Sequence, residues 1–109
     1  MKDKEILEGK NTAIISYLTI VGSLIAITMN MEPKNAFARF HTRQAFGIHL
    51  MYHALAIVLT FTGFNFAWLP LFVLYIIIWG YCFLQALKGQ TKVLPLLGAR
   101  FQEWFTFIP

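Results

Sequence analysis

Residues 44–87 read QAFGIHLMYHALAIVLTFTGFNFAWLPLFVLYIIIWGYCFLQAL and contain no Asp, Glu, Lys or Arg. A helix that crosses a bilayer needs roughly 20 mostly apolar residues, so this run is too long for one crossing. A break is predicted at TGFNF, Thr62–Phe66, because its glycine and asparagine tolerate positive φ and end helices at little cost. Pro70 fits the first turn of a following helix. The run therefore predicts two apolar helices, about residues 45–62 and 66–87.

A further apolar segment without charged side chains covers residues 12–29. Apolar residues make up 58% of the chain and charged residues 13%, which leaves too little polar surface to cover a water-soluble domain of 109 residues. The expected fold is therefore all-α: a polytopic transmembrane helical protein with three apolar segments and short amphipathic interfacial helices. We expect a polar N-terminal tail at residues 1–11, a transmembrane helical domain at 12–87 and an interfacial C-terminal tail at 88–109.

Local signals mark the ends of these segments. Asn11 and Thr12 are predicted to cap the first helix, and Asn30–Pro33 is predicted to end it, because proline disfavours helical geometry at the preceding residue. Lys88 and Gly89 are predicted to end the last helix, since a cation and a glycine both suit exposed carbonyl groups.

The basic residues predict the orientation in the membrane. Cytoplasmic loops are enriched in Lys and Arg, and the turn near residue 63 has neither. The 30–44 loop and the C-terminal tail are therefore expected in the cytoplasm of a bacterium, with the helices in its inner membrane. If residues 12–29 cross fully, the lysines of the N-terminal tail lie outside. If the segment bends back near Gly22 and Ser23 as a re-entrant hairpin, all 9 basic residues lie inside. Both alternatives remain open.

Two short stretches outside the apolar segments have the pattern of interfacial helices. Aromatic and aliphatic residues recur at helical spacing near the C-terminus, and a second such helix is expected across Asn35–Gln44. The apolar side of the C-terminal helix is expected to sink into the headgroup region. Its members are Phe101, Trp104, Phe105 and Ile108, and the predicted interfacial anchors are Arg39, Arg43, Lys88 and Trp104.

The block FHTRQ, Phe40–Gln44, admits two interpretations. In the first, Arg39 and Arg43 lie one helical turn apart and bind lipid phosphates. In the second, His41 and Gln44, also one turn apart, make a polar contact with the C-terminal tail or with a partner protein. The residues predicted for this motif or partner contact are Phe40, His41, Arg43 and Gln44.

His49 and His53 lie four residues apart and are expected on one face of the second apolar helix. They could form hydrogen bonds with neighbouring helices, act as a proton relay or polar channel lining, or bind a metal ion or haem. Two imidazoles are an incomplete metal site, since zinc usually takes three or four ligands. We therefore predict no cofactor, and we expect Cys82 to be a packing residue.

Nucleic-acid binding and catalysis are not indicated. The net charge of +4 is dispersed over tails and loops, so the sequence contains no basic groove with stacking aromatic residues. The acidic residues lie in tails or loops, and no nucleophile motif is present. The protein is therefore not expected to be an enzyme.

Three segments together resemble a known family. NTAIISYLTIVGSLIAITMN (11–30), NAFARFHTRQAFG (35–47) and LKGQTKVLPLLGARFQEWF (87–105) are similar to the small bacterial relatives of the 20-kilodalton component of the chloroplast inner-envelope protein import translocon. The most specific elements are FHTRQ, KGQ and PLLG. The resemblance implies an integral membrane protein with four spanning helices that contributes to a preprotein-conducting channel, whereas this chain has three apolar segments.

These observations lead to one functional expectation with two alternatives. The chain is expected to be an accessory or channel-like component of a membrane assembly, linked to protein translocation by the resemblance alone. The first alternative is a structural or lipid-organising subunit, and the second is a cofactor- or metal-binding subunit that uses His49 and His53. The expected partners are the lipid bilayer and either further copies of the chain or other membrane proteins.

Overall fold

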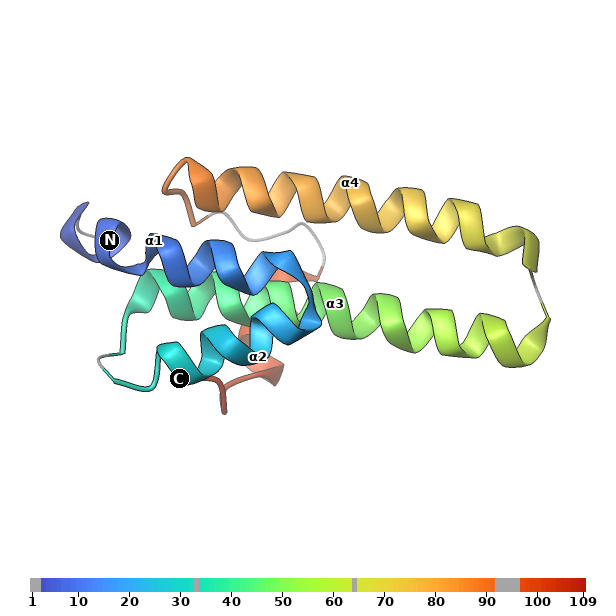
Figure 1. Ribbon diagram of the computed structural model, residues 1–109, viewed down its shortest axis with the longest axis horizontal. Helices are drawn as coiled ribbons and strands as arrows, with labels where there is room; N and C mark the ends of the chain where they lie inside the picture. Colours follow the sequence, from blue (N-terminus) through green and yellow to red (C-terminus); the bar gives the residue numbers. More distant parts are fainter. Residues whose placement is uncertain (1–2, 33, 64, 92–96) are drawn as a thin grey trace.

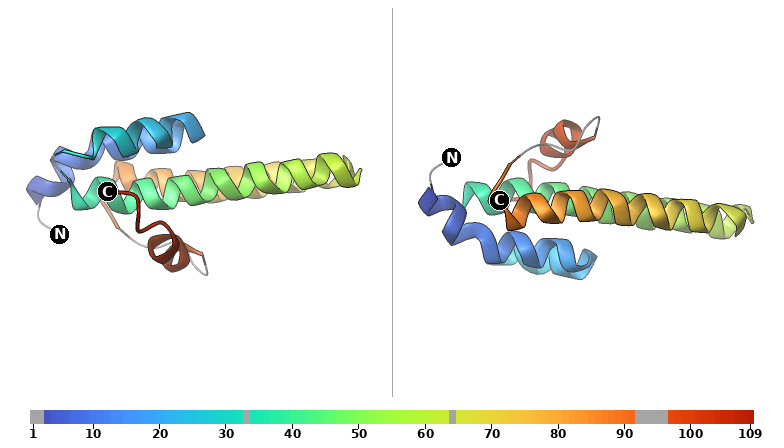
Figure 2. Two further views of the ribbon diagram at one scale, coloured as in Figure 1. Left: turned by 90° about the horizontal axis from the view of Figure 1, so that it is seen from below. Right: turned by 90° about the horizontal axis from the view of Figure 1, so that it is seen from above.

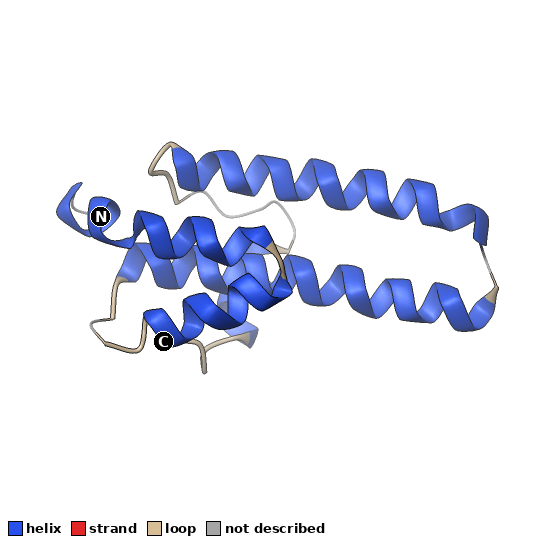
Figure 3. Cartoon of the chain, viewed as in Figure 1, coloured by secondary structure: helices blue, strands red, loops and turns tan. Residues whose placement is uncertain are grey.

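The structure is a computed structural model that describes residues 3–32, 34–63, 65–91 and 97–109. Every regular element in these ranges is helical (Figure 3), so the expected all-α class is confirmed for them. Pro33, in the predicted helix end, and Pro95, in the PLLG element, lie outside the described ranges. The elements are α1 (Asp3–Leu18), α2 (Ile20–Met29), α3 (Ala36–Thr62), the short 3-10 helix η1 (Asn65–Ala67), α4 (Trp68–Leu87) and α5 (Gly98–Trp104).

Helices α3 and α4 form a long antiparallel pair (Figure 1), and the break between them falls where the sequence predicted it. Gly63 ends α3 with φ of 77°, a left-handed conformation that glycine adopts without steric cost. At the other end, α4 stops at Lys88, and Gly89 follows with φ of 71°. Both helix-ending predictions are confirmed.

The start of α3 differs from the prediction. The side chain of Asn35 caps the helix by accepting the Ala38 N–H at 2.9 Å, and the helix then continues without interruption to Thr62. Residues 35–44 therefore do not form a separate interfacial helix. They are the first turns of α3, because no helix-breaking residue separates them from the apolar run that follows.

The apolar segment 12–29 forms a hairpin rather than one continuous helix. Helix α1 already begins at Asp3, so Asn11 and Thr12 lie within it and do not cap it. The chain reverses at Thr19, whose extended backbone and side-chain bond to the Gly22 N–H start α2. This reversal lies three residues before the predicted bend, and α2 runs back alongside α1 (Figure 1).

The molecule has two regions, which we call the base and the arm. The base comprises α1, α2, α5, residues 36–49 of α3 and residues 78–87 of α4. The α1–α2 hairpin covers one face of the α3–α4 pair and α5 covers the opposite face (Figure 2). The core of the base contains Ala13, Tyr17, Phe37, Ala45, Ile48, Cys82, Ala86 and Phe101.

The arm comprises residues 50–63 of α3 and its cap, η1, and residues 68–77 of α4, and neither face of it is covered by another helix (Figure 2). Among the described helices, α3 and the η1–α4 segment are long and apolar enough to cross a membrane. In their most apolar windows, only 22% and 6% of the residues are buried, unlike the core helices of a soluble protein. Helix α2, with 10 residues, is too short, so the described ranges contain two candidate spans and a third is not confirmed.

Helix α5 lies in the predicted position, but its predicted aromatic face is divided. Phe101 is 1% exposed and Ile108 is fully buried, because both pack into the base. Trp104 and Phe107, by contrast, are 56% and 69% exposed. The helix ends at Trp104, so residues 105–108 leave the helical register that the sequence pattern assumed.

Candidate functional site

A buried hydrogen-bonded chain connects three segments of the base. The hydroxyl of Tyr17 lies 2.6 Å from Nδ1 of His41, and Nε2 of the same imidazole lies 2.7 Å from the Gln90 carbonyl oxygen. Because a carbonyl only accepts, Nε2 carries the hydrogen, and in the neutral imidazole Nδ1 then accepts from the Tyr17 hydroxyl. Tyr17 and His41 are both fully buried. A neutral His41 thus joins the hairpin to the segment after α4.

Gln44 extends this chain on the other side. Its Nε2 donates to the Tyr17 hydroxyl oxygen at 3.4 Å, and its side chain is fully buried. Of the two residues predicted to contact the C-terminal tail or a partner, His41 reaches the tail at Gln90, while Gln44 reaches the hairpin. Their spacing of one helical turn places both on the side of α3 that faces α1.

Arg43 binds the C-terminal tail. Its guanidinium donates from Nη2 to the carbonyls of Thr106 and Ile108 at 3.2 and 3.0 Å, and from Nε to Ile108 at 3.3 Å. Gln102 donates to the Phe40 carbonyl at 2.8 Å, so the FHTRQ block also holds α5. Of the other predicted anchors, Arg39 is half-buried, and Lys88 and Trp104 are exposed.

The reversal between α1 and α2 is covered by α4. The Trp79 indole N–H donates to the Tyr17 carbonyl, and the Ser23 hydroxyl donates to the Ser16 carbonyl at 2.7 Å. These bonds satisfy carbonyl groups that lose their helical partners at the end of α1. The reversal is therefore a hydrogen-bonded feature of the base.

His49 and His53 have different environments. His49 is 1% exposed, and its Nδ1 lies 2.7 Å from the Tyr75 hydroxyl. The carbonyls of Ser16 and Tyr17 face the His49 ring. The buried Nε2 of His49 nevertheless makes no hydrogen bond to any described group. His53, one turn further, is exposed on the arm, with its ring centroid 5.5 Å from that of Tyr52. The two imidazoles therefore do not converge on one site.

The described residues contain no group of three or more His, Cys, Asp or Glu side chains that could hold a metal ion. Cys82 is buried in the core of the base as a free thiol.

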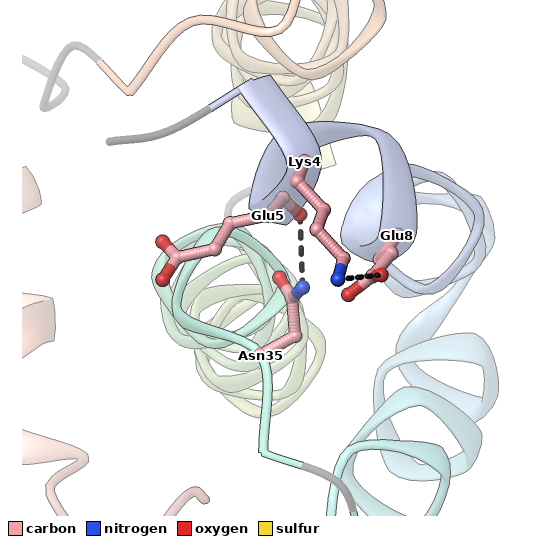
Figure 4. Close-up of polar contacts among 4 residues, drawn as sticks. All are labelled: Lys4, Glu5, Glu8 and Asn35. Carbon is pink, nitrogen blue, oxygen red and sulfur yellow. Dashed lines mark hydrogen bonds and ion pairs between the residues drawn. The ribbon is translucent and has the colours of Figure 1, made fainter.

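A polar recess lies at the open end of the α1–α2 hairpin. It has a volume of about 310 Å³ and is lined by side chains that include Glu5, Glu8, Asn30 and Lys34. Asn35 points toward the first turns of α1, where its amide donates to the Glu5 carbonyl at 2.8 Å (Figure 4). The adjacent Lys4 and Glu8 form an exposed ion pair with an N–O distance of 4.0 Å. The bond from Asn35 to Glu5 fastens α1 to the start of α3, whereas the Lys4–Glu8 pair lies within α1.

Several residues that hold the base together were not predicted to do so from the sequence. Tyr17 and Trp79 lie within the apolar segments, where no local pattern distinguishes them from packing residues. Asn30 is 2% exposed and donates to the carbonyls of Asn35 and Pro109 at 3.1 and 2.9 Å. The available signal was the pair of asparagines that flanks the turn between α2 and α3, since asparagine side chains bind nearby backbone groups at turns.

Comparison with known proteins gives no match: no family model, no curated protein and no solved structure matches the chain.

Proposed function

We propose that this chain is an integral membrane protein in which α3 and α4 cross the bilayer and the α1–α2 hairpin enters from one side without crossing. The observation that carries this proposal is the arm, in which two apolar helices expose large side chains while every Asp, Glu, Lys and Arg lies outside residues 44–87. Exposed side chains of the arm include Ile57 (58%), Phe61 (85%) and Leu69 (71%). Hydrocarbon solvates such a surface better than water does.

The hydrogen bonds at the hairpin reversal support its placement at membrane depth. Irregular backbone survives within a bilayer only where protein satisfies its polar groups. At this reversal Trp79 and Ser23 cover the freed carbonyls, as described above. The His49 ring faces this reversal and lies six residues beyond Arg43, which corresponds to a depth of about 9 Å. The hairpin would therefore enter roughly a third of a hydrocarbon layer about 30 Å thick.

The charge distribution supports a cytoplasmic base. With a hairpin in place of a third crossing, the basic residues of both α1 and the α2–α3 turn lie on the side of the base. The turn at Gly63 has no charged neighbour and would face outward. The proposed location is the inner membrane of a bacterium.

Within this membrane, we propose that the chain is a non-enzymatic accessory component of a larger assembly. The buried side chains of Tyr17 and His41 hold the hairpin, α3 and the segment after α4 together, and the partly buried Arg43 holds the C-terminal tail, which supports a structural role for them. The link to protein translocation, and to a channel-like role, rests on the resemblance of the FHTRQ, KGQ and PLLG elements to the translocon component. A lipid-organising subunit is the second candidate, favoured by the exposed Trp104 and Phe107 beside α5.

Site-specific photocrosslinking separates these two functions. A photoreactive amino acid at Trp104, which is exposed, is compared with one at Phe101, which is buried, in membranes that contain arrested translocation intermediates of a secreted preprotein. An accessory component of translocation gives crosslinks to the preprotein from position 104 and none from position 101. Crosslinks from position 104 to lipid alone would overturn the translocation role and support the lipid-organising one.

A further inference from the structure

Two arginines lie side by side on α3 without an acidic partner. Arg39 and Arg43 are four residues apart on the same face of the helix, and their positive charges are close enough to repel each other. Within the described residues, the one ion pair joins Lys4 and Glu8, so neither guanidinium is neutralised by a carboxylate. An anion that binds between two such like charges removes their repulsion.

The two guanidiniums differ in what already holds them. Arg43 donates through Nε and Nη2 to the carbonyls of Thr106 and Ile108, which leaves the N–H groups of Nη1 without a partner in the described part of the chain. The side chain of Arg39 makes no hydrogen bond or ion pair to any described residue. Both side chains are half-buried against the base rather than fully exposed. Their free N–H groups have the planar fork geometry that suits phosphate oxygens.

Toward the arm, the same face of α3 becomes apolar. Phe46 and Leu50 continue the steps of three and four residues that start at Arg39, and Leu50 is 41% exposed. The half-buried ring of Phe46 meets the ring of Phe107, in the tail, edge to face with centroids 6.3 Å apart. In the membrane crossing proposed above, Arg43 lies at the boundary of the hydrocarbon layer. Phe46 and Leu50 then lie about 5 and 10 Å deeper.

We propose that this face of α3 binds one anionic phospholipid of the cytoplasmic leaflet, with the lipid phosphate on Arg39 and Arg43 and an acyl chain along Phe46 and Leu50. The proposal rests on the membrane crossing of α3 proposed above. The order of groups along the face, cationic and then apolar, matches the order of phosphate and acyl chain in a lipid that lies parallel to the helix. A zwitterionic lipid has a positive group beside its phosphate, which weakens its attraction to two arginines. The site therefore prefers a lipid with net negative charge, such as phosphatidylglycerol.

Lipid titration followed by native mass spectrometry tests this preference. The delipidated protein in detergent is titrated with phosphatidylglycerol or with phosphatidylcholine of the same acyl chains, and the fraction of protein with one bound lipid is measured. Phosphatidylglycerol is expected to bind about tenfold more tightly. Arg39→Gln should weaken its binding about fivefold, and Arg39→Lys, which keeps the charge, should restore most of the loss.

Arg100→Gln is the matched control for this titration. It removes the same charge from an exposed position on α5, and it should leave the affinity for phosphatidylglycerol unchanged. Equal affinities for the two lipids, or an equal loss on Arg39→Gln and Arg100→Gln, overturn the site, because the attraction is then a general effect of charge. Displacement of phosphatidylglycerol by an equal concentration of inorganic phosphate overturns the lipid assignment, because the site then binds an anion without an acyl chain.

Photocrosslinking in vesicles tests the position of the acyl chain. A photoreactive amino acid replaces Leu50 or, as the control, Val73 on α4, which is 47% exposed. In vesicles of phosphatidylglycerol and phosphatidylcholine, the lipid captured at position 50 should be enriched about fivefold in phosphatidylglycerol, and Arg39→Gln should abolish the enrichment. The lipid captured at position 73 should match the vesicle composition. Equal composition at the two positions overturns the proposed site.

Extraction of the vesicles with alkaline carbonate separates the failure of this site from the failure of the membrane crossing. A chain that stays in the membrane but shows no enrichment at position 50 overturns the lipid site alone. A chain that carbonate releases overturns the membrane crossing and the lipid site together.

Discussion

The hydroxyl of Tyr17 and Nδ1 of His41 lie 2.6 Å apart, and this hydrogen bond joins the end of α1 to the first turns of α3. Because Nε2 of the same ring donates to Gln90, one imidazole connects the hairpin, α3 and the segment after α4. The Tyr17 and His41 side chains both lie within the base, and the Gln90 carbonyl lies just beyond the end of α4. The hydrogen bond therefore acts as a fastening between parts of the chain that are far apart in sequence.

Removal of the Tyr17 hydroxyl should weaken the base. Tyr17→Phe leaves Nδ1 of the buried His41 without a donor, which costs about 1–3 kcal/mol of unfolding free energy. Denaturant titration of the detergent-solubilised protein, followed by circular dichroism, measures the loss. Tyr81→Phe is the matched control, since Tyr81 is 39% exposed and its variant should lie within about 0.5 kcal/mol of the unchanged chain. Equal stabilities of the two variants would contradict the fastening role.

His49 and Tyr75 should be coupled. Their side chains lie 2.7 Å apart, so either His49→Leu or Tyr75→Phe leaves the other polar group without its partner. The double variant removes both groups and should be less destabilised than the sum of the single changes, with a coupling energy of about 0.6–1.7 kcal/mol. The same titration applied to the four proteins measures this cycle. Strict additivity would show that the bond contributes nothing.

Gly47 should be intolerant of any side chain. A Cβ at this position would lie 2.5 Å from Cγ of Phe101, so Gly47→Ala should displace α5. Trypsin cleavage after Arg100, within α5, measures this displacement and should become at least about fivefold faster. Gly80→Ala is the control, because a Cβ there meets nothing within 4 Å and alanine favours the helix by about 1 kcal/mol. Identical cleavage rates would place α5 elsewhere.

Arg43 should hold the C-terminal tail. Arg43→Gln removes the bonds of the guanidinium to the carbonyls of Thr106 and Ile108, which hold the tail against α3. Amide hydrogen exchange of residues 105–108 should therefore accelerate. Arg39→Gln, one turn away, provides the comparison and should leave this exchange unchanged. Acceleration by both changes alike would indicate a general effect of charge on the interface.

The parts of the fold that the sequence predicted depend on local chemistry. The break at Gly63 and the end of α4 at Lys88 follow from residues that act on their own backbone. The reversal at Thr19 was harder to place, because serine, threonine and tyrosine also occur within continuous apolar helices. Its position depends on Trp79, whose indole binds the Tyr17 carbonyl across 62 residues of sequence. Such a contact is absent from any local pattern.

The residues of the site could be predicted from the sequence, but the contacts that they make could not. The FHTRQ block indicated polar contacts, yet only the fold shows that Arg43 faces the C-terminal tail while His41 and Gln44 face the hairpin. His49 and His53 share a helix face by spacing alone. The α1–α2 hairpin extends along α3 as far as His49 but not as far as His53, so His49 is buried and His53 is exposed.

The arrangement of the hairpin and the arm is tested most directly by the accessibility of three single cysteines. In a Cys82→Ala background, Lys10→Cys, Lys34→Cys and Asn65→Cys are labelled with a membrane-impermeant maleimide in vesicles of both orientations. Lys10 lies within α1, Lys34 lies in the turn between α2 and α3, and Asn65 lies at the tip of the arm. We predict that positions 10 and 34 react from the cytoplasmic side and position 65 from the opposite side. Reaction of positions 10 and 34 from opposite sides, or of all three from one side, would contradict the account.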